Sequence, residues 1–485
     1  MSRISELEPR EVFSFFEKIS EIPRGSYHTR KISDYCVAFA KERGLWVVQD
    51  KQNNVIVKKP ASEGYEDCEP VIIQGHLDMV CEKRADSVHD FSKDGLDLYV
   101  EDGFLKARDT TLGADDGIAM AYALALLDSD GIAHPPLEVV LTTDEEVGML
   151  GADKLDLSPL EGHMLLNLDS DEEGVLLAGC AGGFDFTMDM PLVWERADGV
   201  EIDLQIGGLQ GGHSGAQIHQ QHGNANKLAG RLISCLDARG NVRLCQVTGG
   251  TKDNVIPSRC TLKIVADADD VVSIESFCGE MLATWRAEFG PDEPDLSLQV
   301  KVGGEGTKTV MDRESMEKVA CFLLNCPDGV HEYSRFLKGL VETSDNLGVV
   351  ATDDGGLHCK ILTRSGTDSK LEEFKQRLSS FAGLLGASFH IEGEYPAWSY
   401  RETSRVRPVV VDAYQKIFGR EPVVTTIHAG LECGLFCGKK PGLDCVSFGP
   451  QMFDIHSVNE RLDIESTRRT WELLKEILRQ CGRMG

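Results

Sequence analysis

The segment VIIQGHLD (residues 71–78) is the best starting point for predicting the fold class of this 485-residue chain. It begins as a mostly apolar run without polar alternation and ends in polar residues. Similar runs recur at LEVVLTT (137–143), HMLLNLD (163–169) and DCVSFG (444–449). Runs of this kind, separated by helical segments such as DDGIAMAYALALLDS (115–129), are typical of a largely parallel sheet covered by helices on both faces. We therefore predict an α/β domain.

The middle of the chain has a different pattern. The small-residue segment AGCAGGFDF (178–186) leads into alternating strands such as VEIDLQIGG (200–208) and CTLKIVADA (260–268), which helical segments separate. From YPAWSY (395–400) onward the first pattern returns. We therefore predict an α/β domain interrupted by an inserted α+β domain. The expected boundaries are 1–184 for the first part, 185–396 for the insertion and 397–485 for the second part.

Composition excludes several classes of protein. Lys and Arg total 50 against 79 Asp and Glu, and the formal net charge of −29 makes a nucleic-acid partner unexpected. No run approaches the roughly 20 apolar residues that span a bilayer, and the start lacks the apolar region of a signal peptide. The 15 cysteines are an odd number without CxxC pairs, as in proteins of a reducing compartment. We expect a cytoplasmic protein without a membrane partner.

Polar side chains follow the apolar runs closely. They are His76 and Asp78 after the first run, Asp144-Glu145-Glu146 after the second, Asp169 after the third and His456 seven residues after the last. Asp115 stands at the start of the apolar helical segment. In open parallel sheets ligands bind beyond the carboxyl ends of the strands, so we expect these side chains to converge.

Each of these residues has an ordinary structural explanation when it is taken alone. The acidic triplet could complement a helix dipole, Asp169 could form a turn, and Asp115 could cap a helix. Together, two histidines and several carboxylates form a mixed nitrogen and oxygen ligand set that suits Zn²⁺, and also Mn²⁺ or Co²⁺. No cysteine-rich spacing of a structural zinc site is present. We predict a catalytic metal site with more than one ion.

Longer motifs surround these residues and continue through the insertion. They are GHLDMV (75–80), TLGADDGIAMA (111–121), TTDEEVGMLGA (142–152), LLNLDSDEEG (165–174), GGHSG (211–215), IHQQHGNANKL (218–228), DNVIP (253–257), IHAGLECG (427–434) and GPQMFDIHSVNERL (449–462). With these motifs the chain resembles, over nearly its whole length, the M20 metallopeptidases, and within them the aminoacyl-histidine dipeptidase branch. The chain departs from the family at Asp115-Asp116-Gly117, where relatives have Asp-Lys-Gly or Asp-Asn-Gly.

The resemblance implies a site with two divalent ions, for which Zn²⁺ is expected and Mn²⁺ or Co²⁺ are alternatives. Its implied roles are His76 and Asp169 on one ion, Glu146 and His456 on the other, Asp115 as the bridge, Asp78 as the residue that orients His76, and Glu145 as the general base.

The resemblance also implies that the insertion is a lid and dimerisation domain, through which a homodimer is expected. His213 in GGHSG would complete the oxyanion site when the lid closes. Asn254 and Arg364 would hold the carbonyl or carboxylate of the substrate. His428 and Glu432 are candidates for the substrate pocket.

The expected activity is hydrolysis of the peptide bond of unblocked dipeptides, with a preference for Xaa-His and with β-Ala-His among the substrates. The alternatives within the family are a tripeptidase, a carboxypeptidase and an N-acyl amino-acid deacylase. A non-catalytic protein on the same scaffold would have lost a ligand or the base, whereas all six positions are present.

Overall fold

The computed structural model describes residues 4–238 and 242–482. The chain divides into two compact units, and the predicted insertion falls in the second of them. The first unit comprises Met1–Cys180, Trp398–Thr426 and Leu431–Gly485, and the second comprises Ala181–Ala397 and Ile427–Gly430. Among the described residues, no helix has the length and apolar character needed to cross a membrane.

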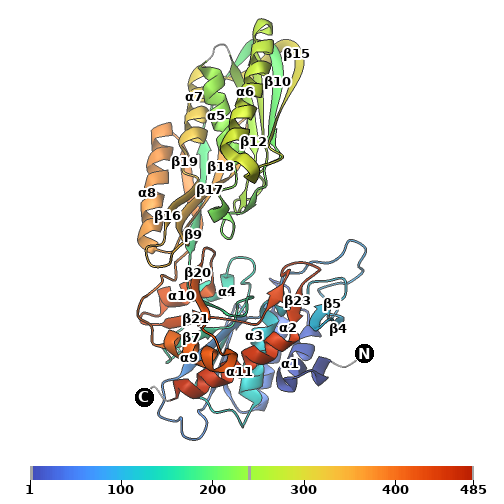
Figure 1. Ribbon diagram of the computed structural model, residues 1–485, viewed down its shortest axis with the longest axis vertical. Helices are drawn as coiled ribbons and strands as arrows, with labels where there is room; N and C mark the ends of the chain where they lie inside the picture. The colour runs from blue at the N-terminus through green and yellow to red at the C-terminus, as the bar shows by residue number, and fades with distance from the viewer. Residues whose placement is uncertain (1–3, 239–241, 483–485) are drawn as a thin grey trace. The chain divides into compact units, whose positions relative to one another are not determined.

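The first unit is built on an eight-stranded sheet (Figure 1). The strands, in spatial order, are β1 (Trp46–Gln49), β2 (Val55–Lys59), β6 (Leu137–Thr142), β3 (Val71–His76), β7 (Met164–Asn167), β21 (Asp444–Ser447), β8 (Val175–Cys180) and β20 (Val423–Ile427). The neighbours β6, β3, β7 and β21 pair in parallel, whereas β1, β2 and β8 make antiparallel pairs. The predicted α/β class is confirmed, but the sheet is mixed, since a short turn such as that between β1 and β2 permits only antiparallel pairing.

Helices cover both faces of this sheet. They are α1 (Arg10–Ser20), α2 (Arg30–Glu42), α3 (Ala114–Asp128), α4 (Leu150–Lys154), α9 (Val406–Phe418), α10 (Glu432–Lys439) and α11 (Ile464–Cys481), with a 3₁₀ turn at Ile4–Glu6. Val71 and Ile73 of β3 pack in one core with α1, α3 and α11, while Ile72 is buried on the opposite face. Every residue of β3 and β6 is buried, which explains why these strands lack polar alternation.

A small sheet completes the first unit. Its strands, in spatial order, are β22 (Met452–Phe453), β23 (Arg461–Asp463), β5 (Phe104–Ala107) and β4 (Leu98–Glu101). All its pairs are antiparallel. The loop between β22 and β23 carries His456, so this sheet anchors both ends of that loop.

The turn after β6 differs from its sequence pattern. The segment EEVGMLGADKL (145–155) predicts a short helix, but only α4 is helical, and Glu145 and Glu146 lie in the turn before it. Gly148 and Met149 have positive φ values of 112° and 58°, which a right-handed helix cannot contain. The helix predicted over 115–129 is confirmed as α3.

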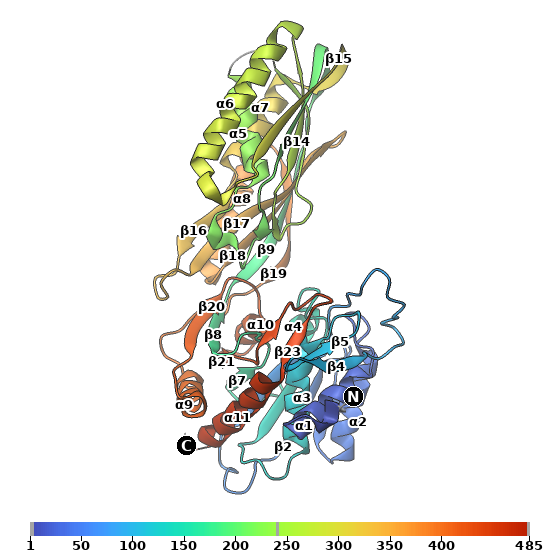
Figure 2. The same cartoon turned by 45° about the vertical axis from the view of Figure 1, so that its right-hand side comes forward.

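The second unit is an antiparallel sheet with helices on one face (Figure 2). The strands, in spatial order, are β15 (Ser297–Met311), β10 (Trp194–Gly207), β14 (Cys260–Ala266), β12 (Arg243–Gly249), β17 (Val341–Asp353), β18 (Gly356–Ser365), β9 (Gly182–Met190) and β19 (Ser388–Tyr395), and β16 (Gly329–Tyr333) pairs with β17. The helices are α5 (Ala225–Asp237), α6 (Val271–Phe289), α7 (Arg313–Asn325) and α8 (Asp368–Leu385), with 3₁₀ turns at Ile218–Gln220, Ala268–Asp270 and Gly290–Asp292. A separate ladder joins β11 (Gly212–His213) to β13 (Val255–Ile256).

Candidate metal centre

Asp115 connects two histidine side chains in the first unit. Its Oδ1 atom lies 3.0 Å from Nε2 of His76, and its Oδ2 atom lies 3.0 Å from Nε2 of His456. Nε2 of His456 also lies 3.0 Å from Oε2 of Glu146. These side chains come from the end of β3, the start of α3, the loop after β22 and the turn after β6. One carboxylate therefore lies within hydrogen-bond distance of both histidines.

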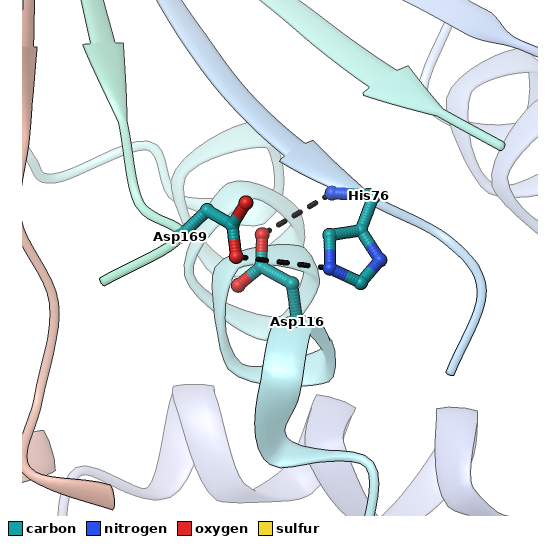
Figure 3. Close-up of side chains that lie close together, drawn as sticks. All are labelled: His76, Asp116 and Asp169. Carbon is teal, nitrogen blue, oxygen red and sulfur yellow. Dashed lines mark hydrogen bonds and ion pairs between the residues drawn. The ribbon is translucent and has the colours of Figure 1, made fainter. Parts of the chain in front are cut away.

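Asp169 and Asp116 extend the cluster on the side of His76 (Figure 3). Oδ1 of Asp169 lies 3.7 Å from Nε2 of His76, and single ligand atoms of His76, Asp116 and Asp169 lie within 4.8 Å of one another. Oδ2 of Asp116 accepts a hydrogen bond from the backbone N–H of His76 at 3.2 Å. Asp115 and Asp116 both have non-helical backbone angles. Asp115 contacts the ring of His76, whereas Asp116 accepts the backbone N–H of the same residue. Asp115 was selected from the sequence by resemblance, and Asp116 was not selected as a ligand.

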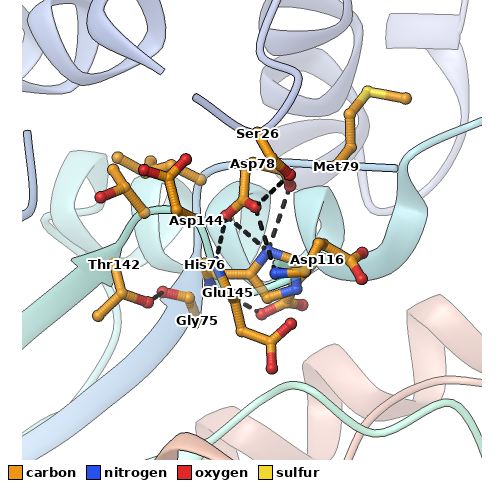
Figure 4. Close-up of polar contacts among 12 residues, drawn as sticks. Ser26, Gly75, His76, Asp78, Met79, Asp116, Thr142, Asp144 and Glu145 are labelled. Atoms are coloured by element: carbon orange, nitrogen blue, oxygen red, sulfur yellow. Dashed lines mark hydrogen bonds and ion pairs between the residues drawn. The ribbon is translucent and has the colours of Figure 1, made fainter. Parts of the chain in front are cut away.

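Asp78 joins His76 to the acidic turn after β6 (Figure 4). Its carboxylate accepts hydrogen bonds from the hydroxyl of Ser26 at 2.8 Å and from the backbone N–H groups of Glu145 and Glu146 at 3.1 and 3.3 Å. Nδ1 of His76 lies 3.2 Å from the carbonyl oxygen of Asp78, to which it donates. This donation leaves Nε2 of His76 as the atom available to a metal ion.

Glu145 lies next to the cluster. Single ligand atoms of His76, Glu145 and Glu146 lie within 4.8 Å of one another, and among the residues that the structure describes the Glu145 carboxylate makes no hydrogen bond to the cluster (Figure 4). Burial raises the pKa of Glu145 to about 8, and the charges of Glu432 and Glu146 act in the same direction. A carboxylate near the ligands that is not itself engaged has the position required of a proton carrier.

The cluster has the spacing and the charge of a cation site. Ligand atoms around a tetrahedral Zn²⁺ ion lie about 3.4 Å apart, close to the distances that Asp115 makes with both histidines. Hydrogen bonds to Asp115 and Glu146 raise the pKa of His456 to about 10. Burial disfavours the charged form of His76, yet the hydrogen bond to Asp115 and the charge of Asp169 raise its pKa well above the ordinary value. Oε1 of Glu146 is buried and has no hydrogen-bond partner among the described residues.

The absence of a side chain at Gly75 makes room for the Asp116 carboxylate against strand β3. A Cβ atom at position 75 would lie 2.5 Å from Oδ2 of Asp116 and 2.6 Å from Cβ of Ala119. We expect Gly75→Ala to lower the free energy of unfolding by about 1–3 kcal/mol, as overpacking does in other buried sites. Urea denaturation measures the change. Gly131→Ala is the control, because nothing lies within 4 Å of its added Cβ. Equal stability of the two variants would contradict the close packing at Gly75.

His213 and Asn254 are brought together in the second unit. The β11–β13 ladder pairs His213 with Val255, and the carbonyl oxygen of Asn254 accepts the N–H of Ser214 at 2.9 Å. Nδ1 of His213 accepts the backbone N–H groups of Gly215 and Ala216, each at 3.1 Å. Burial and the charge of Arg364 lower the pKa of His213. The neutral ring therefore carries its proton on Nε2, as a hydrogen-bond donor.

Arg364 and His428 lie beside this pair. Ser344 is opposite Arg364 in the β17–β18 ladder, and its hydroxyl lies 2.7 Å from Nε2 of His428. The Arg364 side chain is 7% exposed, and Nη1 donates to the Tyr395 hydroxyl at 2.8 Å. Burial and the charge of Arg364 lower the pKa of His428 to about 3. In the part of the chain that the structure describes, no carboxylate lies within ion-pair distance of Arg364.

Glu432 is fully buried in the first unit. Its Oε2 atom accepts hydrogen bonds from Nε2 of Gln74 at 2.5 Å and from the hydroxyl of Thr142 at 2.7 Å. Burial raises its pKa to about 7. The substrate-pocket role of Glu432 stays a prediction, and its Oε1 atom is buried without a hydrogen-bond partner among the described residues.

The fold and this cluster are typical of metal-dependent hydrolases, since two histidines and several carboxylates meet at the carboxyl ends of parallel strands. The sequence profile of Peptidase family M20/M25/M40 matches residues 72–480. The chain belongs to this family, so the predicted relationship and the expectation of a peptidase are confirmed.

Individual relatives agree with this assignment. The chain is 40% identical to the cytosol non-specific dipeptidase of Escherichia coli (strain K12), over 99% of each chain. The crystal structure of aminoacylhistidine dipeptidase from Vibrio alginolyticus superposes with a TM-score of 0.91 at 37% identity, covering 99% of this chain and 98% of that one. Aminopeptidase PepT from Bacillus cereus ATCC 10987 superposes with a TM-score of 0.57 at 15% identity, over 98% of this chain and 99% of that one, which shows a shared fold.

Proposed function

We propose that this chain hydrolyses the peptide bond of unblocked dipeptides with the help of two divalent metal ions. The observation that carries the proposal is the position of Asp115, whose two carboxylate oxygens each lie 3.0 Å from a different histidine. His76 and Asp169 would hold one ion, Glu146 and His456 the other, and Asp115 would bridge them. Zn²⁺ suits this mixed ligand set best, and Mn²⁺ or Co²⁺ are alternatives. When bound, two such ions lower the pKa of a shared water and polarise the scissile carbonyl group.

Glu145 is the residue that we assign to proton transfer. Its carboxylate takes a proton from the attacking water and returns it to the nitrogen of the leaving amine. Asp78 supports this role, because its carboxylate holds the backbone N–H groups of Glu145 and Glu146 and so fixes the turn that carries the base. Asp78 also supports His76. Its Oδ1 atom lies 3.5 Å from Nδ1 of His76, and this contact limits rotation of the imidazole ring.

Recognition of the substrate is assigned to the second unit. His213 offers an N–H donor at Nε2 to the oxygen of the scissile carbonyl, which becomes negative in the transition state. Arg364 binds the free carboxylate of a dipeptide, with Asn254 and His428 beside it. An enzyme that pairs a buried guanidinium with the terminal carboxylate accepts peptide ends and excludes internal segments of proteins.

The names of the relatives support the choice of substrate. The Escherichia coli relative is a non-specific dipeptidase and the Vibrio alginolyticus relative acts on aminoacyl-histidine, so Xaa-His dipeptides, including β-Ala-His, are the proposed preferred substrates. A cytoplasmic location is proposed for the same reason, because the first of these names is that of a cytosolic enzyme. The homodimer through residues 185–396 stays a prediction.

Release of free histidine tests the proposal. Protein loaded with Zn²⁺ or Mn²⁺ is incubated with β-Ala-His and, in parallel, with its N-acetylated form. We expect cleavage of the free dipeptide alone, because acetylation removes the free amino group that an unblocked dipeptide has. Cleavage of the blocked compound alone would identify a deacylase or carboxypeptidase, and two bound ions without any cleavage would identify a non-catalytic protein.

A further inference from the structure

The side chain of Glu460 ends in a cradle of backbone amides in the first unit. Its Oε2 atom accepts the N–H groups of Leu112 and Gly113 at 2.7 and 2.9 Å. Its Oε1 atom accepts those of Ala114 and Asp115 at 2.8 and 3.4 Å. The side chain is 3% exposed. Four successive amides of the segment that presents Asp115 therefore bind one buried carboxylate.

Arg24 binds a backbone carbonyl group of the same segment. Its guanidinium donates to the carbonyl oxygens of Leu77 and Asp78 at 3.2 and 2.9 Å, and to that of Gly113. A Cβ atom on Gly113 would lie 2.7 Å from the guanidinium, so glycine is required for this approach. The amides of residues 112–115 thus bind Glu460, and the carbonyl oxygen of Gly113 binds Arg24. The Asp115 side chain points from this segment toward His76 and His456.

A distant carboxylate binds these amides because the segment itself offers no acceptor for them. The four amides lie before the regular turns of α3, since Asp115 and Asp116 have non-helical backbone angles, and Gly113 has no side chain that could accept them. Glu460 supplies the acceptors that these backbone donors require. It also follows His456 by four residues, and its own N–H donates to the carbonyl oxygen of Ser457 at 3.1 Å. One residue therefore connects the backbone segments of two of the proposed ligands.

We propose that Glu460 is a positioning residue that holds Asp115 and the His456 loop in the geometry required to bind two metal ions. The proposal rests on the proposed function, because it concerns the same ligands. Both carboxylate oxygens are needed, since each accepts two amides. Glutamine has the same shape but only one acceptor, and its NH₂ group would face two backbone donors.

Metal affinity of the full-length Glu460→Gln variant tests this proposal. Its control is Glu138→Gln, at the start of β6 and therefore at the end of that strand that is away from the metal-ligand turn. Glu138 is also a buried carboxylate that accepts backbone amides: it is 2% exposed and accepts the N–H groups of Glu161 and Gly162, both at 3.0 Å. Dissociation constants for Zn²⁺ are measured by competition with a chromophoric chelator, and the absorption of the Co²⁺ forms is recorded. We expect Glu460→Gln to weaken metal binding about 10- to 100-fold and to change the Co²⁺ spectrum, as loss of a supporting contact does at other metal sites. Glu138→Gln should keep the wild-type constants even where its melting temperature falls.

Two outcomes separate this proposal from the one on which it rests. Failure of the wild-type protein to bind two ions would overturn the proposed metal centre itself. Wild-type binding together with equal constants in Glu460→Gln and Glu138→Gln would overturn the positioning role alone. Should Glu460→Gln not fold, Glu460→Asp is measured in its place, and the same results support or overturn the proposal because its shorter carboxylate cannot reach all four amides.

Discussion

Glu145→Gln is expected to lower kcat for dipeptide hydrolysis by about 10²- to 10⁴-fold, the range that removal of a general base costs in other enzymes. The amide cannot take a proton from water, but it keeps the size of the side chain. The backbone N–H of Glu145 would still donate to Asp78, so the turn and its neighbour Glu146 should stay in place. Steady-state kinetics measure the loss, and metal content is measured on the same preparation.

Metal content distinguishes the role of a base from that of a ligand. A base variant keeps both ions, whereas a ligand variant loses at least one. Glu172→Gln, on an exposed side chain of the first unit, serves as the control and should retain wild-type activity. Retention of more than a tenth of the activity by Glu145→Gln would falsify the assigned role.

Asp115→Ala is expected to abolish measurable activity and to reduce the bound metal from two ions to one or none. Both oxygens of Asp115 are used, one toward His76 and one toward His456, so a single substitution affects both proposed ion positions. Without this carboxylate, the ligands would also hold two cations close together with less negative charge between them. Elemental analysis after gel filtration in metal-free buffer gives the stoichiometry, and histidine release gives the activity.

Asp128→Asn at the other end of α3 is the matched control for this experiment. Asp128 forms an ion pair with Arg43 at 2.5 Å, and its side chain is 46% exposed. The control should keep two ions and full activity. Two tightly bound ions in Asp115→Ala would contradict the bridging role and would direct attention to the neighbouring Asp116.

The sequence was sufficient to predict the residue types of the candidate site and the edge of the sheet at which they meet. Apolar strands buried on both faces have no polar alternation, so the first polar residues after each apolar run were sufficient to predict where β3, β6 and β7 end. The turn after β6 was harder to predict. Its acidic residues are compatible with a helix start, and only the backbone angles of Gly148 and Met149 show that α4 begins later.

Local periodicity and short motifs were sufficient to predict the α/β class of the first unit, the family and the candidate ligands, Asp115 among them. Only the folded chain shows that Asp116 also contacts His76, and which distant groups support the ligands. Arg24 and Glu460 lie far from Gly113 in the chain, yet both bind its peptide groups in the folded protein. Such contacts leave no periodic pattern in the sequence, since hydrogen bonds between distant segments exist only after packing has brought buried donors and acceptors together.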